Sequence, residues 1–396
     1  MKIAIHNEPG EAPLGGSDVM AVVLAAELAR KHEVEIYHHR EKLVAGELAQ
    51  HAGVDLSGVT FRRVPRHPSA WWETVRAIWP RVRRERRADL ALTRPLDLYV
   101  TLNHLPPNFS AAKLSVLIVL FPFFEVSRRR TKSRLREAIR SMAYHAEVRS
   151  RLSNYHVKAA ISEFSREWTR RRWLVDTSIL YPPVDVSIGP GRKSNSILSV
   201  GRFAVPRHGH GKKQLEMVAT FGQLRAACAA HWRFFCVGGC GSDADEVAYL
   251  EQVYATATAN GAEIAANIKR AELNELYRSS KIFWHAAGID VDENVEPQHV
   301  EHFGISTVEA MAAGCVPVVM NKGGQKEIVE HGISGFVWNS EREWQDYTLT
   351  LMKDNDLWER MSLAAQNRAQ TFSREKLVER FVALVAPHLS ARGLSL

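Results

Sequence analysis

Short apolar segments alternate with longer segments of helical periodicity along this chain, and that alternation is the strongest constraint on its fold. At the start, "KIAIHN" (2–7) predicts a buried strand, "DVMAVVLAAELARKH" (18–32) a helix and "EVEIYHH" (33–39) the next strand. Further apolar segments predict strands at 59–64, 96–102, 114–121 and 156–162. Since strands that alternate with helices form parallel sheets, this half predicts a parallel sheet covered by helices on both faces.

The periodic pattern stops between residues 178 and 196, where proline, glycine and serine accumulate, and a second series follows. This series predicts strands at 197–203, 232–238, 281–287 and 316–321, with helices at 212–227, 243–260 and 270–280. We therefore predict an α/β protein of two Rossmann-like, doubly wound domains that face a cleft. The predicted boundaries are 1–187 and 188–372, with a C-terminal helix at 373–396 that crosses back to the first domain.

The composition is that of a soluble globular protein, with 45% hydrophobic and 24% charged residues. The longest apolar run, "LSVLIVLFPFF", is too short to span a bilayer, and the start has no apolar core of a signal peptide, so we expect a cytoplasmic protein. Cys228, Cys236, Cys240 and Cys315 show no paired CxxC spacing. We expect them to be free, and no zinc site is predicted.

The formal net charge of +8 indicates an anionic partner. Basic residues gather at 71–87, 127–141 and 166–173, all in the first half of the chain, and the first and last of these segments also contain tryptophans. These segments predict either amphipathic helices that dock on an anionic membrane surface or ordinary solvated helix faces. No helix-turn-helix, RNP or zinc-finger pattern accompanies the charge, so a nucleic-acid partner is not predicted.

Two glycines, Gly15 and Gly16, stand directly before the first predicted helix, in "LGGSD". The amides and dipole at a helix N-terminus favour an anion. A tight turn that needs positive φ would explain the same glycines without a ligand. The dinucleotide fingerprint GxGxxG is absent, which argues against a nicotinamide oxidoreductase.

Four cations follow the first strand of the second series, in "SVGRF" and "RHGHGKKQ". They are Arg202, Arg207, Lys212 and Lys213. Such cations at the carboxyl end of a parallel strand suit a diphosphate, although any one of them could instead form a surface ion pair.

Glu301 and Glu309 lie eight positions apart in "EHFGISTVEAMAAG". Eight residues of helix rise about 12 Å, more than the roughly 5 to 9.5 Å between the carboxylates of a glycoside hydrolase. The spacing therefore fits two ends of one extended ligand, with Glu309 accepting hydrogen bonds from a ribose diol. The alternative without a ligand is a capping box of Ser306 and Glu309.

Taken in order, "LGGSDVMAVVLAAELARKHEVEIY", "YPPVD", "SVGRF", "KKQ", "EHFGISTVEAMAAGCVPVV" and "GGQKEIVEHGISGFVW" resemble the retaining GT-B glycosyltransferases of family GT4, also called glycosyltransferase group 1. The resemblance spans nearly the whole chain and is strongest over residues 197–340. It implies two Rossmann-like domains, a nucleotide diphosphate sugar as donor, and no cofactor or required metal.

The resemblance also implies roles for individual residues. Glu309 would hold the ribose hydroxyls, Glu301 would orient the donor sugar, and Arg202 with Lys212 would hold the diphosphate. An alignment slip of one residue would give the lysine role to Lys213 instead. The remaining donor-binding residues implied are Gly15, Gly16, Phe303, Gly304, Ile305 and Ser306.

Two features depart from the family pattern. Where many members have a histidine near the reacting sugar, this chain has Leu120 and Phe121, and His104 in "TLNHLPPN" is the candidate substitute. In the polar insertion 288–300, Asp290 and Asp292 have the spacing of a DxD metal motif, but the family needs no metal. We expect this insertion to be an acceptor-side or lid element.

The implied reaction moves a hexose-type sugar, with retention, to a hydroxyl of a glycan or lipid-linked acceptor in cell-surface polysaccharide or glycolipid synthesis. The enzyme would be cytoplasmic and peripheral on the inner face of the cell membrane. The alternatives are an epimerase or phosphorylase of the same architecture, and a non-catalytic nucleotide-binding module on the membrane. No lysine site for pyridoxal phosphate, which a phosphorylase needs, is identifiable in the sequence.

Overall fold

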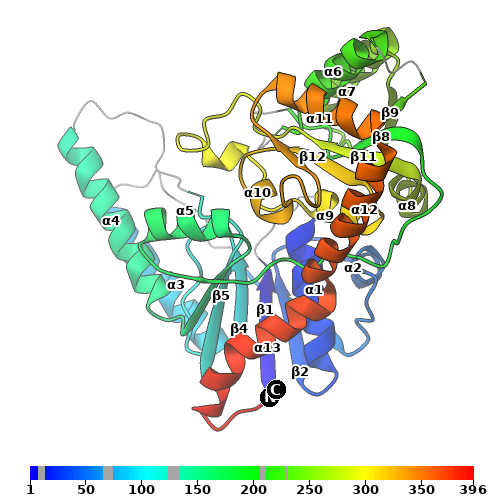
Figure 1. Ribbon diagram of the computed structural model, residues 1–396. Coiled ribbons are helices and arrows are strands. Elements are labelled where there is room, and N and C mark those ends of the chain that lie inside the picture. The colour runs from blue at the N-terminus through cyan, green and yellow to red at the C-terminus, as the bar shows by residue number, and fades with distance from the viewer. Residues whose placement is uncertain (8–13, 66–74, 124–133, 206–210, 228–230) are drawn as a thin grey trace. The chain divides into compact units, whose positions relative to one another are not determined.

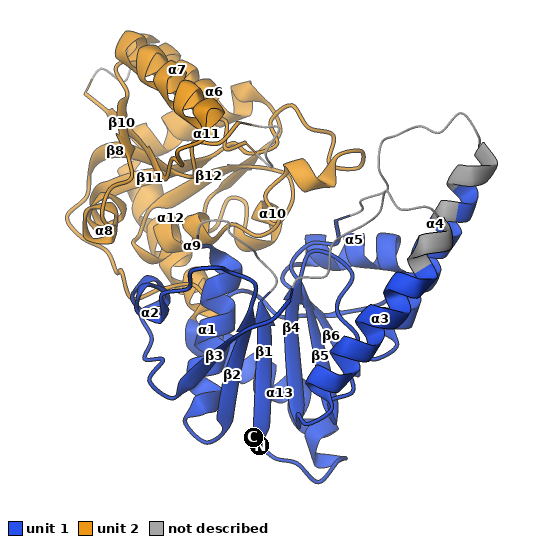
Figure 2. Ribbon diagram, turned by 180° about the vertical axis from the view of Figure 1, so that it is seen from behind, with its two compact units in different colours: residues 1–183, 374–396 blue, residues 184–373 orange. Residues whose placement is uncertain are grey.

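The computed structural model describes the whole chain except residues 8–13, 66–74, 124–133, 206–210 and 228–230. The chain divides into two compact units (Figure 2). Unit 1 comprises Met1–Pro183 and Arg374–Leu396, and unit 2 comprises Val184–Ser373. The predicted boundaries lie within a few residues of these limits.

Unit 1 contains a parallel sheet with the strand order β3-β2-β1-β4-β5-β6-β7 (Figure 1). Its strands are β1 (Lys2–Asn7), β2 (Glu33–His38), β3 (Val59–Arg63), β4 (Leu98–Asn103), β5 (Leu114–Val119), β6 (Val157–Ala160) and β7 (Ser178–Ile179). The central strands β4 and β5 are buried along their full length, as their mainly apolar sequences predict. The strand order reverses between β1 and β4, which is where ligands of such sheets bind.

The helices of unit 1 cover both faces of this sheet. They are α1 (Gly16–Ala29), α2 (Ala45–Ala52), α3 (Val75–Thr93), α4 (Arg134–Leu152), α5 (Glu163–Trp173) and α13 (Arg374–Ser390). Helix α13 comes from the far end of the chain and packs on unit 1 through the buried side chains Leu377, Phe381, Val385 and Leu389. The Arg374 guanidinium also donates to the Gly53 carbonyl at 3.0 Å.

Unit 2 has a second parallel sheet, with the order β10-β9-β8-β11-β12-β13. Its strands are β8 (Ser194–Val200), β9 (Arg233–Gly238), β10 (Glu263–Ala266), β11 (Ser280–His285), β12 (Val316–Met320) and β13 (Phe336–Trp338). Its helices are α6 (Gln214–Ala227), α7 (Ala244–Asn260), α8 (Arg270–Ser279), α9 (Ile305–Ala312), α10 (Gln325–Ile328), α11 (Glu341–Lys353) and α12 (Asn355–Ala369). Here the strand order reverses between β8 and β11.

These two sheets confirm the predicted pair of parallel α/β domains, but three strands were missed. Strands β7, β10 and β13 have two to four residues each. Each lies at an edge of its sheet and is recruited by a longer neighbour, as Ala159 of β6 pairs with Ser178 of β7. Segments this short carry too little periodicity to be recognised from the sequence.

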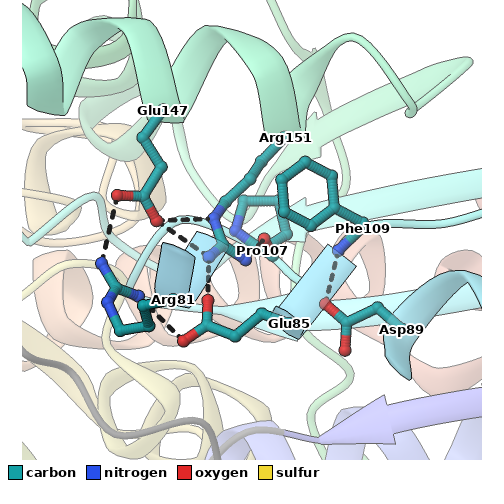
Figure 3. A network of polar contacts seen from close by, with 7 residues as sticks. All are labelled: Arg81, Glu85, Asp89, Pro107, Phe109, Glu147 and Arg151. Carbon is teal, nitrogen blue, oxygen red and sulfur yellow. Dashed lines mark hydrogen bonds and ion pairs between the residues drawn. The ribbon is translucent and has the colours of Figure 1, made fainter. Parts of the chain in front are cut away.

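Helices α3 and α4 of unit 1 are joined by a buried cluster of charges (Figure 3). Arg151 donates to both Glu85 and Glu147, and Arg81 donates to the same two carboxylates at 2.8 and 3.3 Å. Glu85, Glu147 and Arg151 are each at most 5% exposed. Arg151 also donates to the Pro107 carbonyl at 3.2 Å, so the cluster fixes the loop after β4 as well as the two helices.

The basic segments of the sequence divide into different environments. In α5, Arg166 pairs with Glu163, and Arg170 and Arg171 pair with Glu167, as in a solvated helix face. In α3, Arg83, Arg84, Arg86 and Arg87 are exposed. Residues 71–74 and 127–133 of the predicted membrane-facing segments lie outside the described residues. Within the described part of the chain, no helix is both long and apolar enough to span a membrane.

Candidate functional site

The carboxyl end of β8 brings a glycine, an arginine and two lysines together at the point where the strand order of unit 2 reverses. Gly201 follows β8, and a Cβ atom there would lie 2.6 Å from Cγ of Lys212, so the missing side chain makes room for the lysine. The buried Gln214 amide donates to the carbonyls of Gly201 and Arg202 at 3.1 and 3.0 Å. This amide fixes the backbone from which the exposed Arg202 side chain extends.

Lys212 and Glu301, both predicted site residues, form an ion pair between the Lys212 ammonium and Oε2 of Glu301. Their side chains are 19% and 15% exposed, so the pair is partly buried but accessible. Nε2 of His285, the last residue of β11, lies 3.3 Å from the same oxygen. Burial lowers the pKa of His285, while the contact with Glu301 opposes that shift.

Lys213, the alternative to Lys212, has different partners. Its ammonium lies 3.1 Å from both Glu216 and Asp290. Partial burial lowers the pKa of Lys213, but its hydrogen bonds to Asp290 and Glu216 outweigh burial and leave the pKa raised. The backbone of Lys213 has φ of +63°, a left-handed conformation that sends the two neighbouring lysine side chains to different carboxylates.

The capping box of Ser306 and Glu309, the alternative without a ligand, is not formed at the start of α9. The helix begins at Ile305 with Gly304 as its N-cap, so Ser306 is the second helical residue. Gly304 has φ of +126°, and a Cβ atom there would lie 2.3 Å from the amide nitrogen of Gln325. Gln325 is fully buried and accepts a hydrogen bond from the Thr307 hydroxyl at 2.9 Å. A glycine is therefore required by both the backbone conformation and the available space.

The helix start leaves the predicted donor-binding residues in different environments. Ile305 and Ser306 are partly exposed, so the amides of the first turn lie near the surface of unit 2. Phe303 is buried and packs edge-on against Phe372, with ring centroids 5.5 Å apart. Phe303 therefore anchors the loop, while the helix start is placed to meet an anion.

Glu309 forms a second carboxylate site within α9. Its Oε1 accepts from the Arg270 guanidinium at 2.6 Å, and its Oε2 accepts from the Tyr277 hydroxyl at 3.0 Å. Tyr277 is fully buried, and burial together with the Glu309 charge raises its pKa well above the usual value. Arg270 is 48% exposed, so its contact is the one that a ligand could replace. Glu309 is thus buried, held by Tyr277 on one side and covered on the other by the half-exposed Arg270 side chain.

The predicted metal motif has other partners. Asp290 pairs with Lys213, and Oδ1 of Asp292 accepts from the Asn294 amide at 2.9 Å. Among the described residues, no group of three or more His, Cys, Asp or Glu side chains is placed to bind a metal. Cys236 and Cys315 are free and buried, and Cys240 is free and partly exposed. Cys228 and Arg207 lie outside the described residues.

In unit 1, Gly15 is the N-cap of α1 and Gly16 is its first residue. Gly15 has φ of −146°, an extended conformation, so the tight turn with positive φ that the sequence allowed is wrong there. The Gly15 amide donates to the buried Asp18 carboxylate at 2.9 Å, and Asn7 and Arg40 donate to the same carboxylate. The N-terminus of α1 therefore already binds a carboxylate of its own chain, that of Asp18.

His104, the candidate catalytic histidine, lies just after β4. Its ring stacks on Phe123 with centroids 4.8 Å apart, and burial lowers its pKa to about 4. The imidazole is therefore neutral near pH 7 and a weak base. Leu120 and Phe121, where family members have their histidine, are both buried in the core of unit 1.

Three further side chains at these sites were missed by the sequence analysis: Arg270, Tyr277 and His285. Each contacts a predicted glutamate, yet they lie 39, 32 and 16 positions from it in the chain. His285 carried the clearest signal, because a histidine that ends a buried apolar strand is placed at the ligand-binding edge of a parallel sheet.

Comparisons with known proteins show sequence similarity over part of the chain and a shared fold. Residues 187–368 match the family model of the glycosyl transferases group 1. Over 240 residues the chain is 28% identical to the Dictyostelium discoideum protein named GDP-Man:Man(3)GlcNAc(2)-PP-Dol alpha-1,2-mannosyltransferase. That alignment covers 56% of this chain and 44% of the relative, so the chain spans less than half the length of the curated relative.

Solved structures match over nearly the full length of the chain. Anabaena HepE in complex with UDP has a TM-score of 0.67 at 16% identity, covering 99% of this chain and 100% of that one. Sucrose-phosphate synthase from Thermosynechococcus elongatus has a TM-score of 0.68 at 14% identity, covering 98% and 100%. These likenesses show the fold: two Rossmann-like domains of the GT-B type, as the sequence predicts.

Proposed function

We propose that this chain, whose residues 187–368 match the glycosyl transferases group 1, transfers a hexose from a nucleotide diphosphate sugar to a hydroxyl of a glycan or lipid-linked acceptor. The observation that carries the proposal is the presence of two carboxylate–cation pairs in unit 2, Glu301 with Lys212 and Glu309 with Arg270, whose cations are 19% and 48% exposed. Both lie beside the reversal of the strand order, where ligands of doubly wound sheets bind.

Each part of a nucleotide sugar has a counterpart in these residues. Glu309 accepts hydrogen bonds from the ribose diol on the side that Tyr277 leaves open. The first-turn amides of α9, with Arg202 and either Lys212 or Lys213, bind the diphosphate. Glu301 accepts from hydroxyls of the donor sugar. Gly15 and Gly16 of unit 1 are the proposed contacts of the other domain.

Charge builds on the diphosphate as the sugar leaves, so cations aimed at it are the main source of rate enhancement. The proposed reaction retains the anomeric configuration, with the leaving phosphate assisting the incoming hydroxyl on the same face. No metal takes part in this proposal, since the arginine and lysine side chains supply the positive charge. His104 is the proposed polar group of unit 1 at the reacting sugar.

The names of the similar proteins suggest which donors to test first. The Dictyostelium relative is named for GDP-mannose, and the HepE structure contains UDP. A panel of GDP- and UDP-hexoses, scored for nucleotide release with and without lipid-linked and free glycan acceptors, tests the proposal. We expect nucleotide release that depends on the acceptor. With a donor whose anomeric bond is axial, NMR should show a product whose new glycosidic bond is also axial.

The same panel separates the alternatives. An epimerase would convert the donor sugar without any acceptor, and a phosphorylase would need inorganic phosphate as co-substrate. A non-catalytic binding module would bind the nucleotide and release none under any condition. Failure of every donor and acceptor pair, with nucleotide binding intact, would reject the transferase.

We also propose a cytoplasmic location with peripheral association to an anionic membrane through unit 1. Trp79 on α3 is 47% exposed and Met142 on α4 is 72% exposed. The exposed Arg83 and Arg87 continue α3 beyond Trp79. Apolar side chains beside arginines suit the boundary of an anionic bilayer. Co-sedimentation with phosphatidylglycerol vesicles, compared with phosphatidylcholine vesicles, is the test.

A further inference from the structure

His285 and Glu301 meet although an insertion of polar residues separates them in the chain. His285 is 3% exposed and ends β11, the strand beside which the order of the sheet reverses. Its Nε2 lies 3.3 Å from Oε2 of Glu301, the oxygen that also receives the Lys212 ammonium. One carboxylate oxygen is therefore contacted by a cation and by an imidazole.

The insertion 288–300 between them is held at its start by hydrogen bonds from a lysine. The Lys322 ammonium donates to the carbonyls of Gly288 and Val291 at 2.8 and 2.6 Å. Those residues lie three and six positions after the end of β11, so Lys322, which follows β12, holds the backbone that leaves His285. The hydrogen bonds of Lys322 therefore fix the backbone at the start of the insertion.

The end of the insertion is fastened as well. The Glu293 carboxylate accepts from the Gly323 amide and from the Lys326 ammonium, each at 2.7 Å. The Gly324 amide donates to the Glu301 carbonyl at 2.8 Å. Both ends of the loop are thus tied to residues 322–326, which brings His285 and Glu301 to a defined separation.

The proton positions follow from the partners. A carboxylate accepts hydrogen bonds only, so the proton lies on Nε2 of His285. Nδ1 of this buried ring has no hydrogen-bond partner among the described residues. Burial, with a smaller contribution from Lys212, lowers the pKa of His285 against the opposing effect of Glu301. The ring is a neutral donor, which holds the carboxylate without adding a second positive charge beside Lys212.

We propose that His285 is a positioning residue that holds the Glu301 carboxylate towards the donor sugar when Lys212 moves from Glu301 to the diphosphate. This inference rests on the proposed transferase function. Lys212 cannot serve both anions fully, because its pairing with Glu301 occupies the charge that a diphosphate would need. With His285 in place, Glu301 keeps a donor throughout the exchange, so its orientation does not depend on the lysine.

This role predicts a loss that is specific for the sugar. A nucleoside diphosphate has no sugar hydroxyls for Glu301, so its affinity depends on the cations and the helix start alone. A nucleotide sugar depends on the orientation of Glu301 in addition. Loss of the His285 hydrogen bond should therefore lower kcat/KM for the nucleotide sugar. The affinity for the nucleoside diphosphate should change little.

The test compares the full-length wild type with His285→Leu, which removes the donor, and His285→Gln, which keeps an amide nitrogen near the position of Nε2. We expect kcat/KM for the nucleotide sugar to fall about tenfold in His285→Leu, the loss typical of a hydrogen bond to a charged group. His285→Gln should recover most of it. The Kd of the free nucleoside diphosphate, measured by calorimetry, should change less than about twofold.

A matched control is Thr348→Val. The Thr348 hydroxyl accepts from the indole nitrogen of Trp284, the residue before His285, at 3.1 Å, and both are buried. This variant removes a buried hydrogen bond from the same strand without touching Glu301. It should lower the melting temperature and leave the kinetics unchanged, which separates positioning from simple loss of stability.

A spectroscopic measurement is independent of turnover. In protein labelled with ¹⁵N-histidine, the signal that disappears in His285→Gln should belong to a neutral ring with its proton on Nε2 at pH 7. An imidazolium or an Nδ1–H tautomer would overturn the inference. The inference would also be overturned if His285→Leu lowered kcat/KM for the nucleotide sugar and the affinity for the nucleoside diphosphate by the same factor. It would be overturned as well if the wild type is active and His285→Leu has the same kcat/KM. A wild type inactive with every donor would instead reject the proposed function.

Discussion

The molecule contains a buried network of four charged side chains in unit 1 and two separate ion pairs in unit 2, and these differ in burial and in the number of partners of each charge. In unit 1, Arg81, Glu85, Glu147 and Arg151 form a network with side chains no more than 13% exposed, and each carboxylate meets both arginines (Figure 3). In unit 2, Lys212 pairs with Glu301 and Arg270 with Glu309, with cations 19% and 48% exposed.

This difference separates charges that hold a fold from charges that can change partners. A buried, mutually satisfied network has no accessible atom for a ligand, and breaking it leaves a desolvated charge unpaired. A partly exposed pair can exchange one partner for an anion at little cost, because water replaces the lost contact. The first cluster is therefore structural, and the pairs of unit 2 are the candidates for ligand exchange.

The largest expected effect is on stability, in Arg151→Met. The change leaves Glu85 and Glu147 buried with fewer donors, so the free energy of unfolding should fall by about 3 to 5 kcal/mol, as for other broken buried pairs. Denaturant titration of the full chain measures it. Arg84→Met, an exposed arginine of α3, the helix that carries Glu85, should stay within about 0.5 kcal/mol of the wild type. A small loss in Arg151→Met would remove the contrast between the clusters.

Next in size is Arg202→Ala, which should lower turnover by about 100-fold, as for loss of one donor that stabilises transition-state charge. The side chain is exposed, so the melting temperature should barely change. Nucleotide release under saturating donor is the measurement. Arg233→Ala, an exposed arginine of the same unit that pairs with Glu263 at 2.7 Å, is the control. Near-normal turnover in Arg202→Ala would contradict the assignment.

Glu309→Gln should weaken donor affinity about tenfold, because a ribose diol bonds more strongly to a carboxylate than to an amide. The amide oxygen can still accept from Tyr277, and the half-exposed Arg270 can turn to water, so stability should be nearly unchanged. Calorimetric titration with donor, paired with thermal melting, measures both. If stability falls while affinity holds, Glu309 belongs with the structural charges of unit 1.

The smallest expected effect is in Asp290→Asn. This change frees the Lys213 ammonium from one of its two carboxylates, and the donor KM should fall about twofold at low salt. The gain should vanish at high ionic strength. Asp292→Asn, in the same insertion but bonded to the Asn294 amide, is the matched control. An unchanged KM in Asp290→Asn would assign the diphosphate to Lys212 alone.

Much of the architecture was visible in the sequence, because the patterns concerned are local. Apolar runs of five to seven residues mark the strands that are buried on both faces, such as β5 and β12. The short edge strands β7, β10 and β13 were missed because partners across the sheet, rather than their own residues, define them. The alternative capping box put Ser306 at the cap position that the backbone gives to Gly304, because the N-cap is set by a backbone conformation that the sequence pattern does not show.

The sequence by itself determined which residues carry charge and where each lies along its strand or helix: Arg202 after β8, Glu301 before α9 and Glu309 within it. Only the tertiary structure decided their partners. Glu301 meets Lys212 across 89 positions of the chain and His285 across 16. Glu309 meets Arg270 and Tyr277 from another helix, and Arg151 meets Glu85 across 66 positions. Secondary structure follows from local periodicity, whereas ion pairs depend on which strands and helices the fold places side by side.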